Sequence, residues 1–225
     1  MERSTGMDAR SASRLARLAA PPPVDPAPAF SIPQFRRALL TWYRRTARRL
    51  PWRDTHDPYR VWVSEIMLQQ TRVDTVVPYY EHFLAAFPTA QALAAAPLPR
   101  VLHLWQGLGY YRRARHLHRA ALLLVRGHGG ELPRTASAWS ALPGVGRYTA
   151  AAIASIVHGE PVAAVDGNVK RVLARLCRIT DDLDAPATQR RLWALADALL
   201  APRAPGDFNQ AMMELGARVC TPRTP

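Results

Sequence analysis

The stretch from Leu142 to Asn168 reads LPGVGRYTAAAIASIVHGEPVAAVDGN, and it decides the fold. A turn holding Gly144 and Gly146 leads into a helix of small and apolar residues, and a brief extended segment then ends at Asp166. Glycine lacks a Cβ, so such a turn brings bare backbone N–H groups close to an anion. The first turn of the following helix adds its positive dipole end at the same place. The stretch predicts a phosphate-binding turn beside a carboxylate, although an ordinary turn between two helices is the alternative.

The composition is that of a folded, strongly basic protein. The chain has 225 residues, 48% of them hydrophobic, with 30 basic and 17 acidic side chains and a formal net charge of +13. Seven arginines and no acid lie between Arg36 and Arg53, and six arginines and no acid between Arg100 and Arg126. Such runs are typical of a polyanion-binding surface, with a solvated helix face as the alternative. Two cysteines are too few for a disulfide scaffold, and no apolar run approaches the roughly 20 residues of a membrane span.

Hydrophobic periodicity predicts an all-α fold without an internal repeat. The first thirty residues are expected to form a disordered tail, with an organelle transit peptide as the alternative, and residues 31–225 the folded domain. Ser31 with Gln34 resembles a capping box, Pro78 predicts a kink or break, and PVAAVD (161–166) is the one strand-like stretch. Helices are expected over residues 31–49, 59–71, 73–87, 90–95, 99–105, 112–126, 136–142, 147–158, 168–177, 187–200 and 207–219.

A second acid, Glu65, lies in the segment WVSEIMLQQT, whose other residues are apolar or neutral. Neighbours such as Trp62 and Ile66 raise the pKa of a carboxyl group, so that it holds a proton near neutrality. Asp166 at a helix N-terminus is instead expected to stay ionised. An acid paired with an anion suits cleavage of a glycosidic bond through a cationic sugar. A solvated helix residue at Glu65 and a plain helix cap at Asp166 are the alternatives for each acid alone.

Six segments give the chain a specific family resemblance, and they follow one another almost without a gap from about Phe35 to Cys220. The chain resembles the helix-hairpin-helix DNA glycosylase superfamily, with its endonuclease III-like fold, and within it the MutY-type adenine glycosylases. The resemblance implies two interleaved helical lobes with the active site in the cleft between them. The segments are LPWR at Leu50, PYRVWVSEIMLQQTRV at Pro58, VLHLWQGLGYYRRARHLH at Val101, LPGVGRYTAAAI at Leu142, VDGNVKRVLAR at Val165 and FNQAMMELGARVC at Phe208.

The resemblance implies a monofunctional hydrolase of base excision repair that removes adenine opposite 8-oxoguanine or guanine in double-stranded DNA. Bifunctional relatives place a lysine at the position of Tyr148, and a tyrosine cannot form their Schiff base. Glu65 is then the general acid toward adenine N7, Asp166 the anion beneath the sugar cation, and Tyr148 and Asn168 orient the sugar, the acids or the water. An enzyme for oxidised or mismatched pyrimidines and an inactive DNA-binding remnant are the alternatives.

The same resemblance implies how the duplex is held and opened. Side chains from MLQQT and GLGYY wedge into the DNA beside the extruded base. Lys170 is expected to pair with Asp166 or with a phosphate, and a buried helix start is the alternative for at least one of Tyr110 and Tyr111. The expected DNA-binding residues are Gln70, Thr71, Leu108, Gly109, Tyr110, Gly144, Val145, Gly146 and Lys170, and the expected walls of the base pocket are Trp52, Arg53 and Leu68.

Cys220 stands where the family supplies the first of four cysteine ligands to a [4Fe–4S] cluster. The other three ligands, and the C-terminal domain with which MutY-type enzymes recognise 8-oxoguanine, are missing from the sequence. We therefore expect a truncated chain that does not bind the cluster, and an active form without a cluster is the alternative. Cys177 is expected in the core. We also expect a monomer of bacterial type in the cytoplasm, associated with the nucleoid through DNA and making no membrane contact.

Overall fold

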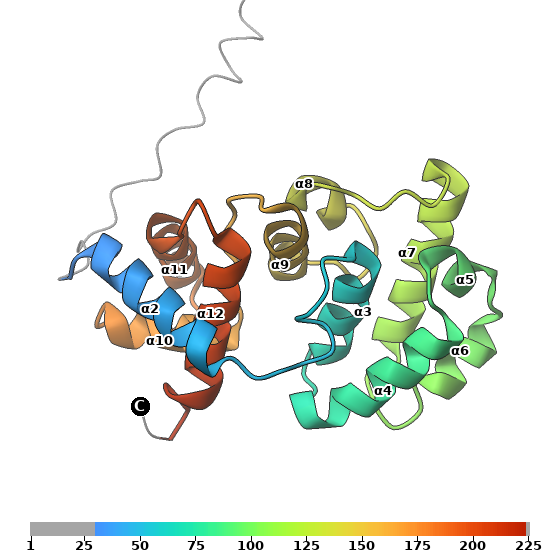
Figure 1. The fold of residues 1–225 in the computed structure, drawn as a ribbon, viewed down its shortest axis with the longest axis horizontal. Coiled ribbons are helices and arrows are strands. Elements are labelled where there is room, and N and C mark those ends of the chain that lie inside the picture. The colour runs from blue at the N-terminus through green and yellow to red at the C-terminus, as the bar shows by residue number, and fades with distance from the viewer. Residues whose placement is uncertain (1–29, 224–225) are drawn as a thin grey trace, which may run out of the picture.

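The computed structural model describes residues 30–223, and every regular element in that range is a helix (Figure 1). The all-α prediction is confirmed, and the predicted helix ends lie within about three residues of the observed ones. Residues 1–29 of the expected tail lie outside the described residues. The helices are α2 (Ile32–Thr46), α3 (Pro58–Leu68), α4 (Val73–Ala86), α5 (Ala90–Ala95), α6 (Leu98–Leu104), α7 (Arg112–His128), α8 (Ala136–Ser140), α9 (Arg147–His158), α10 (Gly167–Leu176), α11 (Pro186–Leu199) and α12 (Pro205–Arg218).

Two hydrophobic cores lie side by side (Figure 1). The first core gathers α3 to α8 around fully buried aromatic residues such as Trp62 and Trp105. The second core gathers α2 with α10, α11 and α12 around Leu173, Leu192 and Phe208. Helix α9 lies between them and packs on α3 and α8 on one side and on α12 on the other. The chain therefore crosses between the cores twice, through residues 47–57 and again through residues 159–166.

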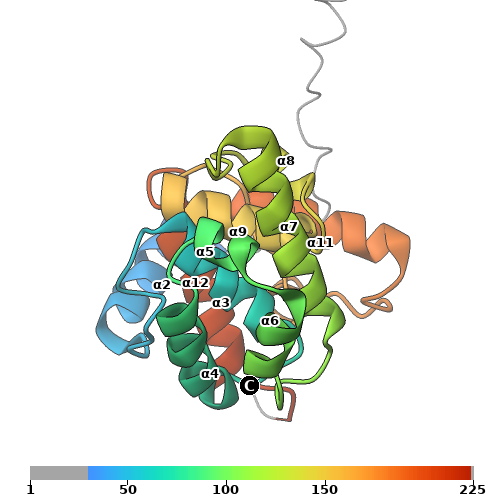
Figure 2. The same cartoon turned by 90° about the vertical axis from the view of Figure 1, so that its right-hand side faces the viewer.

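Helix α7 runs along the outer side of the first core, with α5 and α6 packed against it (Figure 2). Its apolar stripe, including Ala114, Leu117 and Leu124, is buried, whereas arginines occupy much of its outer face. This is the amphipathic pattern expected of a helix at a surface. None of the helices within residues 30–223 combines the length and the apolarity that crossing a bilayer demands.

Local signals explain several helix starts and overturn two of our expectations. Asp57 and Asp166 are N-caps whose side chains accept backbone N–H bonds. Ser31 accepts no capping hydrogen bond, so the predicted capping box is wrong; a proline in the first turn of α2 presets the helical backbone instead. Helix α4 runs unbroken through Pro78, so a break is wrong at this position, whereas the predicted alternative, a kink, stays a prediction. Pro78 is exposed, where solvent can bond the carbonyl group that lacks an N–H partner.

The strand-like stretch 161–166 is not a strand. Asn209 on α12 supplies the bonds that a neighbouring strand would give. Its Oδ1 accepts from the Ala164 N–H at 3.1 Å, and its Nδ2 donates to the Val162 carbonyl at 2.9 Å and to Ser155 Oγ at 2.8 Å. A buried backbone needs such partners. The bonds fix the chain immediately before Asp166.

Candidate active site

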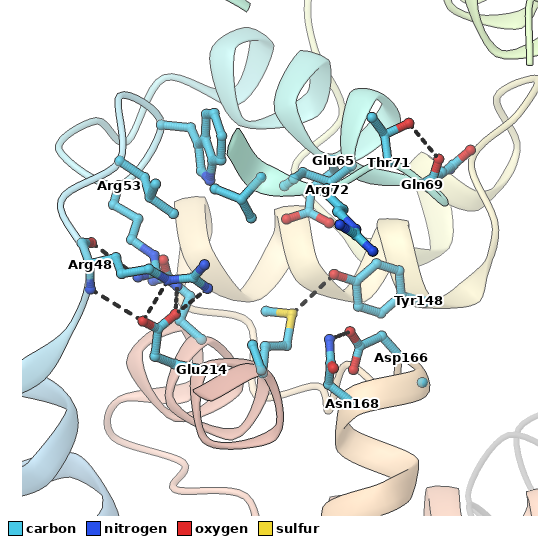
Figure 3. A pocket seen from close by; sticks show the side chains of 18 of the residues that line it. Arg48, Arg53, Glu65, Gln69, Thr71, Arg72, Tyr148, Asp166, Asn168 and Glu214 are labelled. Atoms are coloured by element: carbon cyan, nitrogen blue, oxygen red, sulfur yellow. Dashed lines mark hydrogen bonds and ion pairs between the residues drawn. The ribbon is translucent and has the colours of Figure 1, made fainter. Parts of the chain in front are cut away.

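An open cavity of about 850 Å³ lies between the two cores, and both predicted acids line it (Figure 3). Glu65 comes from α3 in the first core, and Asp166 from the start of α10 in the second. Figure 3 shows the Glu65 side chain directed toward Tyr148, with Asp166 and Asn168 on the opposite wall. The cavity thus brings together residues that lie a hundred positions apart. All residues predicted for catalysis or for the base pocket are among its lining: Glu65, Asp166, Tyr148, Asn168, Trp52, Arg53 and Leu68.

Glu65 is buried, with 5% of its surface exposed. Burial raises its pKa to about 7, and the charge of Asp166 adds to the rise, while the Tyr148 hydroxyl and Arg53 lower it. Its Oε2 atom makes no hydrogen bond to any residue in the described range. The apolar neighbourhood read from the sequence therefore has the expected effect, and this carboxyl group is able to hold a proton at neutral pH.

Asp166 caps α10 and also faces the cavity. Its Oδ1 accepts from the Val169 N–H at 2.7 Å, and its Oδ2 accepts from Asn168 Nδ2 at 2.8 Å. Burial raises its pKa, against the lowering effect of these bonds and of Arg171. Reasoning from the helix N-terminus alone missed this burial, and the expectation that Asp166 stays ionised remains a prediction. The bonds nevertheless favour the charged form of Asp166, whereas Glu65 Oε2 lacks any such bond.

Tyr148 and Asn168 link the two acids to the surrounding helices. The Tyr148 hydroxyl donates to Met213 Sδ on α12 at 3.0 Å, and burial together with the two carboxyl groups holds its pKa well above the usual value. It therefore remains a hydrogen donor. Asn168 Oδ1 accepts from Arg171 Nη2 at 2.9 Å, and Arg171 Nε donates to the Cys220 carbonyl at 2.6 Å. Asp166 is thus connected through two side chains to the segment that follows α12.

Sequence reasoning missed Glu214, a fully buried carboxylate of α12 that lines the same cavity. It accepts from Arg48 Nη2 and from Arg53 Nη2, both at 2.8 Å. Burial raises its pKa, but the hydrogen bonds from the two arginines outweigh that effect and lower it to about 2. These ion pairs attach residues 47–57, which connect the two cores, to α12. They also engage the guanidinium of Arg53, a residue predicted to form a wall of the base pocket. A lone acid among the apolar residues of MMELG is the one signal the sequence offered.

The two predicted wedge segments, MLQQT and GLGYY, each present an exposed side chain. Gln70 and Tyr110 have backbone φ angles of 58° and 47°, a conformation that favours glycine, and Tyr110 is 61% exposed. Tyr111 is 41% exposed, so a buried helix start is wrong for both tyrosines. Leu108 is buried in the first core and does not project beside them. Thr71 and Gly109 are half-buried next to the exposed pair.

The glycine turn lies beside these segments rather than on the cavity. Gly144 has φ 79°, and a Cβ on it would stand 2.7 Å from the Cβ of His116 on α7, so the turn requires glycine there. Gly146 is the N-cap of α9 and a Cβ on it would meet open space, so contacts within the protein do not demand glycine at this position. Val145 is buried in the first core, which leaves the backbone of the turn to face outward.

Several predicted cations are engaged within the protein. Lys170 Nζ lies 3.7 Å from Asp184 Oδ1 and makes no ion pair with Asp166, so the first of its two predicted partners is wrong, whereas a phosphate stays a prediction. Arg36 donates to the carbonyl groups of Ala198 and Leu199 at the end of α11. Arg113 is buried. Only part of each arginine run is therefore free to meet a polyanion, with Arg112, Arg115 and Arg119 among the exposed members on α7.

The cysteines do not form a metal site among the described residues. Cys177 is buried in the second core as predicted, and Cys220 Sγ accepts from Arg175 Nη1 at 3.1 Å. No group of three or more His, Cys, Asp or Glu residues within positions 30–223 is arranged to hold a metal ion. A [4Fe–4S] cluster takes four thiolates. The described residues offer Cys220 alone at this end of α12, so they do not by themselves fit the cluster.

Comparison with known proteins gives one family and a consistent set of relatives. The HhH-GPD superfamily of base excision DNA repair proteins matches residues 63–197. The adenine DNA glycosylase of Homo sapiens is 52% identical over 200 residues, covering 85% of this chain and 37% of the human protein. The adenine DNA glycosylase of Schizosaccharomyces pombe is 44% identical, covering 86% of this chain and 46% of that protein. The adenine DNA glycosylase of Buchnera aphidicola subsp. Schizaphis graminum is 38% identical, covering 85% of this chain and 55% of that protein. The chain thus spans between 37% and 55% of these proteins.

Solved structures agree on the fold. A thermostable thymine-DNA glycosylase superposes with a TM-score of 0.76 at 30% identity, covering 86% of this chain and 89% of that one. Endonuclease III in a non-covalent DNA complex superposes with a TM-score of 0.71 at 23% identity, covering 87% and 90%. The second likeness concerns the fold alone.

Proposed function

Because the chain belongs to the HhH-GPD superfamily of base excision DNA repair proteins, we propose that it is a monofunctional DNA glycosylase that hydrolyses the N-glycosidic bond of adenine mispaired with 8-oxoguanine or guanine. Identities of 38–52% to adenine DNA glycosylases support the choice of base. The observation that carries the proposal is the pairing of Glu65 and Asp166 on one cavity in unlike surroundings. Two carboxyl groups whose environments differ divide naturally into an acid and an anion.

Glu65 is the proposed general acid. A carboxyl group with a pKa of about 7 is half protonated at neutral pH, where proton donation is most effective. The base leaves as an anion unless it is protonated, so a proton given to adenine N7 stabilises the leaving group. The free Oε2 atom has no competing hydrogen bond within the described residues.

Asp166 is the proposed anion beneath the sugar. As the bond to the base lengthens, positive charge develops on the sugar ring, and a nearby carboxylate stabilises it. Hydrogen bonds from Val169 and Asn168 hold the carboxylate in place and favour its charge. Water then forms the new bond to the anomeric carbon. Alternatively, Asp166 forms a brief ester with this carbon, and water hydrolyses the ester.

Tyr148 and the position of Lys170 support hydrolysis without strand cleavage by the protein. A Schiff base with the sugar requires an amine beside the reacting carbon. The chain has one lysine, Lys170, and its ammonium group pairs with Asp184 and does not line the cavity. Tyr148, which remains protonated, is suited to orient the sugar or the water by hydrogen bonding.

We further propose that the protein acts as a monomer on double-stranded DNA in the cytoplasm. Both acids reach the cavity from the same chain, so a second copy is not needed to complete the site. The glycine turn between α8 and α9 is suited to hold a phosphate without reading the base sequence, and so are the exposed arginines of α7. Trp52 and Leu68 offer apolar walls for the extruded base.

The test uses a duplex with one adenine opposite 8-oxoguanine, labelled on the adenine strand. Incubation with the protein followed by hot alkali is expected to cleave that strand at the adenine, whereas omission of the alkali leaves it intact. Cleavage without alkali contradicts the monofunctional assignment. Release of thymine from a G:T duplex with no release of adenine contradicts the choice of base, and places the chain nearer to the thymine-DNA glycosylase it resembles in fold.

Variants separate the two acids from binding. Glu65→Gln and Asp166→Asn are each expected to slow base release by roughly a hundredfold or more while duplex affinity stays within a few-fold of the parent. The matched control is Glu81→Gln, which removes an exposed acid of α4 away from the cavity lining. An unchanged rate in Glu65→Gln contradicts its role as the acid.

A further inference from the structure

Arg113, in the first turn of α7, is a buried cation whose hydrogen-bond partners are all uncharged. Its exposed fraction is 8%. A buried guanidinium is costly unless its donors are satisfied. The partners of Arg113 are five backbone carbonyl groups and one hydroxyl, and together they occupy both terminal nitrogens. So many neutral acceptors around one charge indicate a structural task for this side chain.

One terminal nitrogen binds the end of α3, the helix that carries Glu65. Arg113 Nη1 donates to the carbonyl groups of Ile66 at 3.1 Å, Met67 at 2.7 Å and Gln69 at 2.5 Å. The last carbonyl groups of a helix have no partner within the helix and carry partial negative charge. Arg113 therefore caps α3 from outside and fixes the residue that precedes Gln70.

The other terminal nitrogen reaches a second loop as well as the first. Arg113 Nη2 donates to Thr71 Oγ1 at 3.0 Å and to the carbonyl groups of Leu108 at 3.1 Å and Gly109 at 3.3 Å. The first acceptor follows Gln70, and the last precedes Tyr110. A single guanidinium thus fixes the backbone on both sides of Gln70 and immediately before Tyr110.

Those two residues are both in strained conformations, which Arg178 alone shares among the other non-glycine residues of the described range. Gln70 and Tyr110 both have positive φ angles, which side chains larger than glycine avoid unless the surroundings hold them. The Tyr110 ring also lies over the guanidinium, with Arg113 Cζ 5.5 Å from its centroid. Both side chains nevertheless project outward. The hydrogen bonds of Arg113 to the neighbouring residues therefore hold the backbone of both loops in these unfavourable conformations.

We propose, on the basis of the proposed function, that Arg113 is a positioning residue for base extrusion. It holds loop 69–71 and loop 108–110 as one unit, so that Gln70 and Tyr110 enter the duplex together. Only a planar group with several donors in a fixed fork can satisfy acceptors from both loops at once. A lysine keeps the charge but has one nitrogen, which cannot bridge the same distance.

The experiment follows extrusion directly, by the fluorescence of 2-aminopurine in place of the target adenine in the duplex. Arg113→Lys is expected to reduce the extruded population or its rate of formation by roughly tenfold or more. Arg190→Lys, which makes the same change at an exposed position of α11, is the matched control and is expected to behave as the parent. An Arg113→Lys protein that extrudes the base as the parent does overturns the proposal.

A double-mutant cycle tests whether Arg113 acts through the two exposed side chains. If it does, Arg113→Lys costs little more when added to Gln70→Ala with Tyr110→Ala. If the loss of extrusion from Arg113→Lys simply adds to the loss from Gln70→Ala with Tyr110→Ala, the proposal is overturned, because Arg113 then acts through other residues. A protein that extrudes the base without releasing it contradicts the proposed function and leaves this comparison intact.

Thr71→Val covers the case in which Arg113→Lys fails to fold. It removes one acceptor of Arg113 and leaves the buried charge with the other five. A smaller loss of extrusion, with an unchanged thermal midpoint, is expected. A Thr71→Val protein with full extrusion, alongside an unfolded Arg113→Lys, reduces Arg113 to a contributor to stability and overturns the positioning role.

Discussion

Gly216 on α12 lies directly against Asn168 at the start of α10. A Cβ built on Gly216 would stand 2.6 Å from the Cβ of Asn168 and 2.8 Å from its carbonyl oxygen. A Cβ essentially never lies within 3.0 Å of an atom to which it is not bonded. The missing side chain at Gly216 is therefore what allows α12 to press on the helix start that holds Asp166.

Gly216→Ala is accordingly expected to displace Asn168 and to disturb the hydrogen bond that it gives to Asp166. We expect adenine release under single-turnover conditions to slow by roughly ten- to a hundredfold, because small displacements at a reacting site are expensive. Gly127→Ala on α7 adds the same methyl group in open space and is expected to leave the rate unchanged. A Gly216→Ala rate equal to that of the parent contradicts the tight contact.

The rate of base release should depend on pH through Glu65. The proposed acid is active when protonated, and its pKa is about 7. The single-turnover rate is therefore expected to be level below pH 7 and to fall about tenfold for each pH unit above it. A rate measured from pH 6 to 9 checks this, and a rate that rises with pH over that range shows that Glu65 is not acting as an acid.

The same buried acid predicts a pH dependence of stability. The folded pKa of about 7 lies above the ordinary value of 4.5, so the stability contribution of neutral Glu65 is complete below pH 4.5 and lost as pH rises through 7. Glu65→Gln removes this loss. The variant is expected to exceed the parent in free energy of unfolding by about 2–3 kcal/mol at pH 8, and to match it near pH 4.5. Thermal unfolding of the parent and of Glu65→Gln at pH 4.5 and pH 8 tests this difference in stability, with Glu81→Gln as the reference variant.

Glu214 predicts the opposite dependence. Its folded pKa of about 2 lies below the ordinary 4.5, so its contribution is present above pH 4.5 and disappears as pH falls toward 2. Glu214→Gln is expected to lower the free energy of unfolding by about 3 kcal/mol at pH 7, since two arginines lose a buried partner. Asp207→Asn breaks the exposed pair with Arg44 and is expected to cost less than about 1 kcal/mol. Equal losses in both variants contradict the special status of Glu214.

The sequence predicted what depends on local chemistry. Helix ends follow from nearby caps, glycines and prolines, so they could be placed closely, and the apolar neighbours of Glu65 indicated its raised pKa. Local signals also misled in places. Ser31 had the right partner spacing for a cap without forming it, and Pro78 was accommodated on the exposed side of α4.

What could not be predicted depends on contacts between distant parts of the chain. Glu214 binds Arg48 across 166 positions, and Asn209 fixes residues that lie 45 positions away. Asp166 stands at the start of α10, which packs against α12, and its burial belongs to this tertiary packing. Arg113 looked like one more surface arginine in a basic helix, because nothing in its own segment shows the carbonyl groups of α3 that surround it. The family resemblance supplied the pairing of Glu65 with Asp166, which periodicity alone does not give.

The packing of α2 against α12 sets an order for assembly during synthesis. Residues 50–158 contain all helices of the first core, and they can collapse as soon as α9 has left the ribosome. Helix α2, although it precedes every helix of the first core, finds its partners only in α10, α11 and α12, so its apolar side stays uncovered until those three helices have been made. A nascent chain halted before α10 therefore carries Glu65 in a formed lobe opposite an unfinished wall, and the proposed site is complete only when α10 and α12 have joined α2.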